Sequence, residues 1–93
     1  METSELEQIS IVVILRRVAD AGGALTIHPE GDLDAYEMYE EWGTGLWELE
    51  PADGGQHQVD PGEAFIISIS PAGWELLALL DTAKREERRV LAV

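Results

Sequence analysis

With 93 residues, 45% of them hydrophobic, the chain is long enough for one small core, and we expect a single domain over residues 1–93. Its 19 acidic and 6 basic residues give a formal charge of -13. This charge excludes most binding to nucleic acid or anionic membranes, because such binding depends on Lys and Arg. The lack of cysteine excludes disulfides and thiolate metal sites and is typical of a cytoplasmic protein.

No membrane-spanning or targeting segment is expected. The longest strongly apolar run, Ile11 to Leu15, falls short of the ~20 residues that a membrane span needs. Glu2, Glu5 and Glu7 stand where a secretory signal carries positive charge.

The basic residues gather at two places. All six lie in the pair Arg16–Arg17 and the cluster Lys84, Arg85, Arg88 and Arg89. Residues 18–83 therefore contain acids but no Lys or Arg, which predicts a negative potential over most of the surface and favours a basic partner. An alternative is that the charge reflects a host with an acidic proteome, such as a halophile, and serves solubility alone.

The first predicted element is a helix from Ser4 to Asp20. Ser4 and Glu7 have the spacing of a capping box, in which each side chain satisfies a backbone N–H of the first turn. Apolar residues then recur at helical spacing over a wide arc, and Gly22–Gly23 supplies the left-handed conformation that often ends a helix. The β-branched stretch from Ile9 to Val13 leaves a strand as the alternative.

A short strand and a second helix follow. Ala24 to His28 has β-propensity, and Asp32 is expected to cap a helix from Leu33 to Trp42. On a helical wheel its apolar residues share one arc and its acids lie opposite. The apolar residues are Ala35, Met38, Tyr39 and Trp42, and the acids are Asp34, Glu37, Glu40 and Glu41.

A β-hairpin and a last helix complete the predicted order. Strands are expected at Leu46 to Glu50 and Ala64 to Ile69, joined by a long polar tip of turn residues. Ser70 and Pro71 fit the N-cap and the first position of the last helix. We expect Trp74 to lie in the core beside the main apolar row, which is Leu76, Leu79, Leu80 and Ala83.

The order helix–strand–helix–β-hairpin–helix predicts an α+β fold and resembles a winged-helix domain. The match is closest where Phe65-Ile-Ile-Ser-Ile runs into Ser70-Pro-Ala-Gly, which is similar to the second wing strand and closing helix of bacterial winged-helix regulators. Gly45-Leu-Trp resembles the turn into their first wing strand. Such regulators place two helices before the wing, and the second enters the DNA major groove. Residues 29–45 have room for one helix, and it is acidic, so the resemblance implies the fold without direct DNA reading.

Catalysis, metal binding and cofactors are not expected. The only imidazoles are His28 and His57, and no nucleophile, phosphate-binding or dinucleotide motif occurs. The alternating series His28, Glu30, Asp32 and Asp34 offers hard ligands, but it fits neither the EF-hand spacing nor a zinc deaminase motif. We therefore predict that the protein is not an enzyme.

The acidic face of the second predicted helix is the strongest candidate for a binding site. Carboxylates three and four residues apart on a helix are ~5–6 Å apart at Cβ, a spacing comparable to that of phosphates along a nucleic-acid strand. An ordinary soluble surface mixes both signs of charge, whereas this face has no cation. The predicted partner-binding residues are Asp32, Asp34, Glu37, Glu40, Glu41, Trp42, Trp47 and Glu48, with one of the two tryptophans exposed beside the acids.

By analogy, these features are similar to those of small acidic phage inhibitors, such as anti-CRISPR and anti-restriction proteins that mimic nucleic acid. We predict a non-enzymatic acidic domain that blocks a basic, nucleic-acid-binding surface of a partner protein. Two alternatives stay open: an acidic helix that only aids solubility, and a transcription-regulator module related to winged helices. That module would act through protein contacts as a homodimer, joined by the N-terminal helix with Arg16 and Arg17 facing acids of the second copy.

Overall fold

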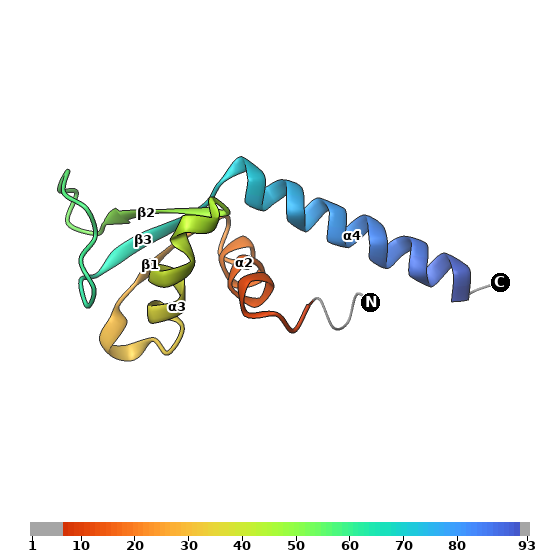
Figure 1. The fold of residues 1–93 in the computed structure, drawn as a ribbon, viewed down its shortest axis with the longest axis horizontal. Coiled ribbons are helices and arrows are strands. Elements are labelled where there is room, and N and C mark those ends of the chain that lie inside the picture. Colours follow the sequence, from red (N-terminus) through yellow and green to blue (C-terminus); the bar gives the residue numbers. More distant parts are fainter. Residues whose placement is uncertain (1–6, 92–93) are drawn as a thin grey trace.

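A computed structural model describes residues 7–91, with the side chains of residues 7–89, and has an α+β fold (Figure 1). This part of the chain forms three α-helices, one three-stranded antiparallel sheet and two 3₁₀ turns. The predicted order of elements is confirmed, and each strand lies within one residue of its predicted limits. The elements are α2 (Ser10–Asp20), β1 (Ala24–Ile27), η1 (Pro29–Gly31), α3 (Ala35–Glu40), η2 (Glu41–Thr44), β2 (Trp47–Pro51), β3 (Phe65–Ile69) and α4 (Pro71–Leu91).

The sheet has one covered face and one open face. Its strand order is β1-β3-β2, so β3 pairs antiparallel with both neighbours. Trp47 and Ile67, 1% and 0% exposed, point to the face on which α2 and α3 pack (Figure 1), where they meet Leu15 of α2 in the core. Because side chains alternate along a strand, Glu48 and Glu50 point to the other face and are exposed.

An ion-pair cluster joins the start of α2 to α4. Helix α2 begins at Ser10, and residues 7–9 are not helical; the predicted start at Ser4, and with it the Ser4 half of the capping box, lies outside the described residues. Glu7 instead accepts hydrogen bonds from Arg16 Nε at 3.1 Å and Arg16 Nη2 at 2.6 Å. Arg16 also donates to Asp81 at 2.8 Å. The bonds from Arg16 lower the pKa of Glu7, and the bonds to Glu7 and Asp81 raise the pKa of Arg16.

The end of α2 confirms the predicted glycine stop. Gly22 and Gly23 have φ angles of 98° and 99°, in the left-handed region that favours glycine. The Gly23 N–H donates to the Val18 carbonyl at 2.9 Å, which satisfies an orphan carbonyl of the last turn. Since the helix includes Val13, the strand alternative for that stretch is wrong.

The start of α4 confirms the predicted N-cap. The Gly73 N–H donates to Ser70 Oγ at 3.2 Å, and Ser70 Oγ donates to the Gly45 carbonyl at 2.5 Å. From Pro71 the helix runs past the body of the molecule (Figure 1) and sets its longest dimension, 53 Å. Among residues 7–91, no helix combines the length and the apolar character needed to cross a membrane.

The buried side of α4 differs from the prediction. Leu77 and Leu80 are buried, whereas Trp74 is 45% exposed, so the prediction that it lies in the core is wrong. The cause is Gly73, where an added Cβ would overlap the carbonyl oxygen of Leu46. The helix turns its smallest residue towards the body, because only there can the two backbones approach so closely.

Replacing Gly73 by alanine is expected to destabilise the domain by about 1–3 kcal/mol or more, because the backbone of Leu46 cannot yield as a flexible side chain would. Gly43→Ala is the matched control, since nothing lies within 4 Å of a Cβ built there. We expect the control to change the free energy of unfolding by less than about 0.5 kcal/mol. Urea unfolding followed by circular dichroism measures both, and equal effects would contradict the close approach.

Candidate protein-binding surface

Asp32 and Asp34, two of the predicted partner-binding residues, bind Arg17 of the same chain. Arg17 Nη1 donates to Asp32 Oδ1 at 2.9 Å and Nη2 donates to Asp32 Oδ2 at 2.5 Å, which makes a bidentate pair. Arg17 Nη1 also lies 3.3 Å from Asp34 Oδ2. The bond from Arg17 lowers the pKa of Asp32. Both acids are engaged by one arginine of the same chain, which offsets one of their two negative charges, so neither is a free carboxylate.

Trp47 is a further correction to the predicted set. Its side chain is 1% exposed, and its Nε1–H donates to the Met38 carbonyl at 2.8 Å, which ties β2 to α3. A partner therefore cannot reach it. Trp42, on the other side of the same turn, is 38% exposed and is the tryptophan available to a partner.

The second predicted helix keeps its two faces but is shorter than expected. Of the predicted residues 33–42, those from Ala35 to Glu40 form α3, and the next two begin the η2 turn. The helix therefore does not start directly after Asp32, the predicted cap. Ala35 and Met38 are buried, at 5% and 0% exposure. The carboxylates of Glu37 and Glu40 are exposed, and Glu41 is partly exposed. The predicted division into an apolar and an anionic side is therefore confirmed for Ala35 and Met38 against Glu37 and Glu40, whereas Trp42, predicted on the apolar side, is exposed.

The open face of β2 adds two carboxylates, of which the sequence analysis predicted only Glu48. Glu48 and Glu50 line a hollow of about 440 Å³ together with Trp42, Leu49 and Ser68. The missed residue, Glu50, follows Glu48 by two positions, so the period of a strand was the signal that could have identified it.

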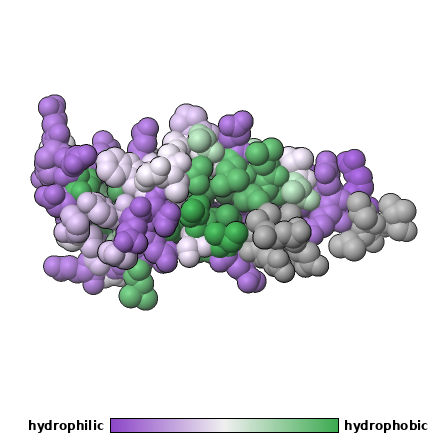
Figure 2. Space-filling view, in the orientation of Figure 1, coloured by the Kyte–Doolittle hydropathy of each residue, from purple (hydrophilic) through white to green (hydrophobic). Residues whose placement is uncertain are grey.

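We give the name acidic surface to two groups of carboxylates: Glu37, Glu40 and Glu41 on α3 and η2, and Glu48 and Glu50 on the open face of β2, where Trp42 lines the same hollow. Within the described residues, none of the five carboxylates takes part in an ion pair. Figure 2 shows hydrophilic side chains over the end of the molecule that holds α3, the sheet and the hairpin tip, and hydrophobic ones over its middle. All six basic residues belong to α2 and α4, so the described elements between these helices carry acids and no Lys or Arg.

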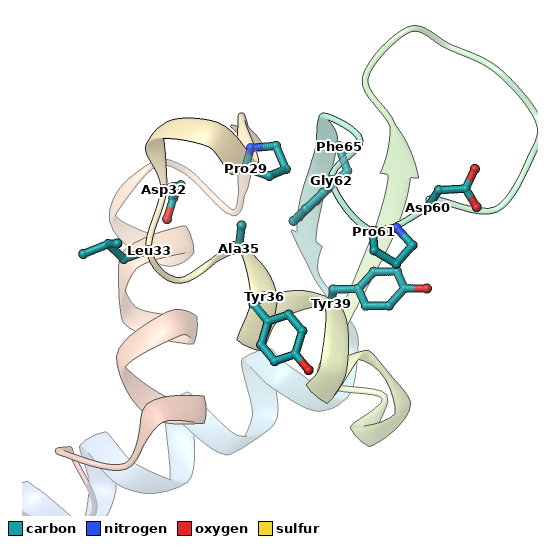
Figure 3. Close-up of a pocket in the computed structure, with 10 residues that line it drawn as sticks. All are labelled: Pro29, Asp32, Leu33, Ala35, Tyr36, Tyr39, Asp60, Pro61, Gly62 and Phe65. Atoms are coloured by element: carbon teal, nitrogen blue, oxygen red, sulfur yellow. The ribbon is translucent and has the colours of Figure 1, made fainter.

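A second concavity lies between η1, α3 and the end of the hairpin loop (Figure 3). It has a volume of about 330 Å³, and its walls include Pro29, Tyr36, Tyr39, Pro61 and Phe65. Tyr36 is 67% exposed and hydrogen-bonds Glu40, which raises the pKa of the phenol. This pocket could not be predicted from the sequence, because its walls come from segments that only the fold brings together.

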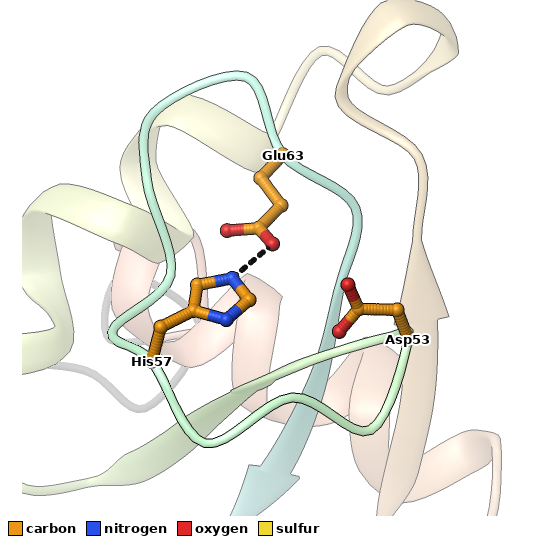
Figure 4. A group of neighbouring side chains, drawn as sticks. All are labelled: Asp53, His57 and Glu63. Atoms are coloured by element: carbon orange, nitrogen blue, oxygen red, sulfur yellow. Dashed lines mark hydrogen bonds and ion pairs between the residues drawn. The ribbon is translucent and has the colours of Figure 1, made fainter.

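The hairpin tip holds a cluster of Asp53, His57 and Glu63 (Figure 4). His57 Nε2 and Glu63 Oε1 are 2.5 Å apart, and Glu63 Oε2 accepts the Asp60 N–H at 2.9 Å. One ligand atom from each of the three residues lies within 4.8 Å of the others, so in the described part of the chain this group could hold a metal ion. The series His28 to Asp34, considered from the sequence, forms no such group there.

The pKa of His57 is raised, mainly by its hydrogen bond to Glu63, and the pKa of Glu63 is lowered by the Asp60 N–H and then by His57. The contribution of His57 to folding stability is complete at pH values below its ordinary pKa of 6.5, and it is lost as the pH rises through the raised pKa of the folded state. The contribution of Glu63 to folding stability is complete at pH values above its ordinary pKa of 4.5, and it is lost as the pH falls through the lowered pKa of the folded state.

We expect Glu63→Gln to lower the pKa of His57 in an NMR titration of the imidazole, because the substitution removes the charged acceptor of its hydrogen bond. An unchanged pKa would contradict the bond.

Compared with known protein families, with curated proteins and with solved structures, the chain shows no match. By its fold and its surface, the protein is a small α+β domain with exposed carboxylates on α3 and β2 and an exposed tryptophan, Trp42.

Proposed function

We propose that the protein is a non-enzymatic, acidic protein-binding domain that blocks a basic, nucleic-acid-binding surface of a partner, in the manner of anti-CRISPR and anti-restriction inhibitors. One observation carries the proposal: the five carboxylates of the acidic surface have no cationic partner among the described residues, and exposed Trp42 follows Glu41 in the chain and shares a hollow with Glu48 and Glu50. Carboxylates supply long-range attraction to Lys and Arg, and tryptophan supplies contact area.

The internal ion pairs of α2 support the proposal, because they keep its two arginines from the acidic surface. Arg16 binds Glu7 and Asp81, while Arg17 binds Asp32 and Asp34, so both arginines of α2 are engaged away from the acidic surface. The negative potential of the surface is therefore not cancelled locally. It would both speed encounter with a basic partner and repel nucleic acid.

The winged-helix relationship is part of the same proposal. The order of elements supports it, whereas α3 and the η2 turn present Glu37, Glu40 and Glu41 where a DNA-reading helix needs cations. A winged-helix fold whose DNA-reading face has become negatively charged would compete with nucleic acid for the basic surface of the partner protein.

The test is capture on the immobilised chain from a nuclease-treated lysate of its host, followed by elution with duplex DNA or with neutral dextran. We expect DNA, and not dextran, to release the captured protein. Glu37→Gln/Glu41→Gln should lose capture, and Glu75→Gln/Glu86→Gln, which removes the same charge from exposed positions of α4, should retain it. If the two variants captured the protein equally, the position of the charges would not matter, capture would be non-specific ion exchange, and the proposal would be refuted.

The second candidate is a dimeric regulator module that acts through protein contacts. Its support is α4, which leaves the body of the molecule with Leu79 63% exposed and Trp74 45% exposed, and α2, where Ile9 and Val13 are each 44% exposed. Light scattering after size exclusion separates the candidates. A stable homodimer that Leu79→Lys dissociates favours the regulator module, and a monomer that captures a DNA-released protein favours the inhibitor.

A further inference from the structure

The pocket beside α3 has aromatic and proline walls that no other part of the described chain fills. Tyr36 is 67% exposed at its mouth, and Leu33, which also lines it, is 100% exposed. At about 330 Å³ it falls at the lower end of the ~300–1,000 Å³ range of small-molecule pockets. Exposed apolar groups around a concavity mark a place where a side chain or ligand is taken up.

The rim of this pocket carries one carboxylate that makes no direct ion pair within the described residues, although its charge is among those that raise the pKa of His57. Of its two aspartates, Asp32 is held by Arg17, but neither a hydrogen bond nor an ion pair from the described residues reaches the Asp60 carboxylate. His57, the imidazole of the same loop, hydrogen-bonds Glu63 instead. Figure 3 shows the Asp60 carboxylate beyond Pro61, on the same side as the Tyr39 ring and directed away from the cavity.

We infer that this pocket receives an arginine side chain of the basic partner, an inference that rests on the proposed function. The methylene stem packs on the proline walls, the planar guanidinium stacks on Tyr36 or Tyr39, and its N–H groups donate to Asp60. Lysine offers a compact charge without a stacking plane, and a purely apolar side chain would leave Asp60 unpaired. The pocket therefore adds a specific contact to the long-range attraction of the acidic surface.

The inference is tested by NMR titration of the ¹⁵N-labelled full chain with the peptide acetyl-Gly-Arg-Gly-amide. We expect saturable shifts at Tyr36, Tyr39 and Asp60. The citrulline peptide, which keeps the shape of arginine without its charge, should bind at least about tenfold more weakly. Equal binding of the two peptides, or shifts confined to the hollow at Trp42 and Glu48, would overturn the inference.

Pocket variants make the test residue-specific. Asp60→Asn and Tyr36→Ala should each weaken the arginine peptide about two- to fivefold. Tyr36→Phe, which retains the ring, and Glu75→Gln, which removes a charge on α4, should bind as the parent does. If the first two variants bound the peptide as the parent does, and their well-dispersed spectra showed that they are folded, the pocket would not be the arginine site.

Failure of this inference and failure of the proposed function give different results. If Asp60→Asn and Tyr36→Ala still capture the DNA-released protein at parental affinity, the role of the pocket is overturned and the proposed function stands. If the arginine peptide binds the pocket as expected but no captured protein is released by DNA, the proposed function is overturned.

Discussion

Reversing Glu37 and Glu41 to lysine is expected to weaken binding to the basic partner by on the order of a hundredfold, the largest effect on affinity that we predict. Both carboxylates belong to the solvent side of α3 and η2, and neither has an ion-pair partner in the described chain. Like charges brought face to face across an interface cost several kcal/mol, and about 2.8 kcal/mol corresponds to a hundredfold change. Surface plasmon resonance with the DNA-released partner measures the dissociation constant.

The control for this reversal is Glu75→Lys/Glu86→Lys on α4, which changes the net charge by the same amount at exposed positions. The far-UV circular dichroism of both variants should match that of the parent, because the substitutions leave the core intact. If the α4 variant lost as much affinity as the α3 variant, net charge alone would explain binding and the acidic surface would have no special role.

Replacing Trp47 by alanine is expected to lower the free energy of unfolding by about 3–5 kcal/mol. The side chain is 1% exposed, and its loss opens a cavity between β2, α3 and the rest of the core. It also leaves the Met38 carbonyl without the indole donor that now lies 2.8 Å away. A domain of this size has ~5–15 kcal/mol in all, so the variant should be close to unfolding. Urea unfolding followed by circular dichroism measures the change.

Trp42→Ala is the matched control, since Trp42 is 38% exposed and belongs to the surface. We expect it to cost less than about 1 kcal/mol in stability while weakening partner binding. Should it destabilise the domain as much as Trp47→Ala does, the assignment of one tryptophan to the core and the other to the surface would be wrong.

Elements set by local chemistry could be predicted from the sequence. Gly22–Gly23 ends α2 through backbone conformation alone, and Ser70 caps α4 through one side chain three residues from its partner. The alternation in β2 likewise reports which residues face the core. These signals act over a few residues, so the order of the elements and the approximate limits of the strands follow from them.

The rest depends on contacts between distant residues. Arg17 reaches Asp32, 15 positions away, and this changes a predicted binding residue into an internal ion pair. On α4, the spacing of large apolar residues suggested one buried side, but the approach of Gly73 to Leu46 selects another and leaves Trp74 exposed. Periodicity gives the faces of an element; it does not give the partner against which each face packs.

The most direct measurement is the association rate of the chain with its DNA-released partner as salt rises from about 50 to about 300 mM. If unpaired carboxylates beside Trp42 guide docking, the rate falls at least about tenfold over this range, and Glu37→Lys/Glu41→Lys is both slower and far less sensitive to salt. A rate that stays constant with salt, or that falls equally in the reversed variant, would mean that these acids keep the domain dissolved and do nothing more.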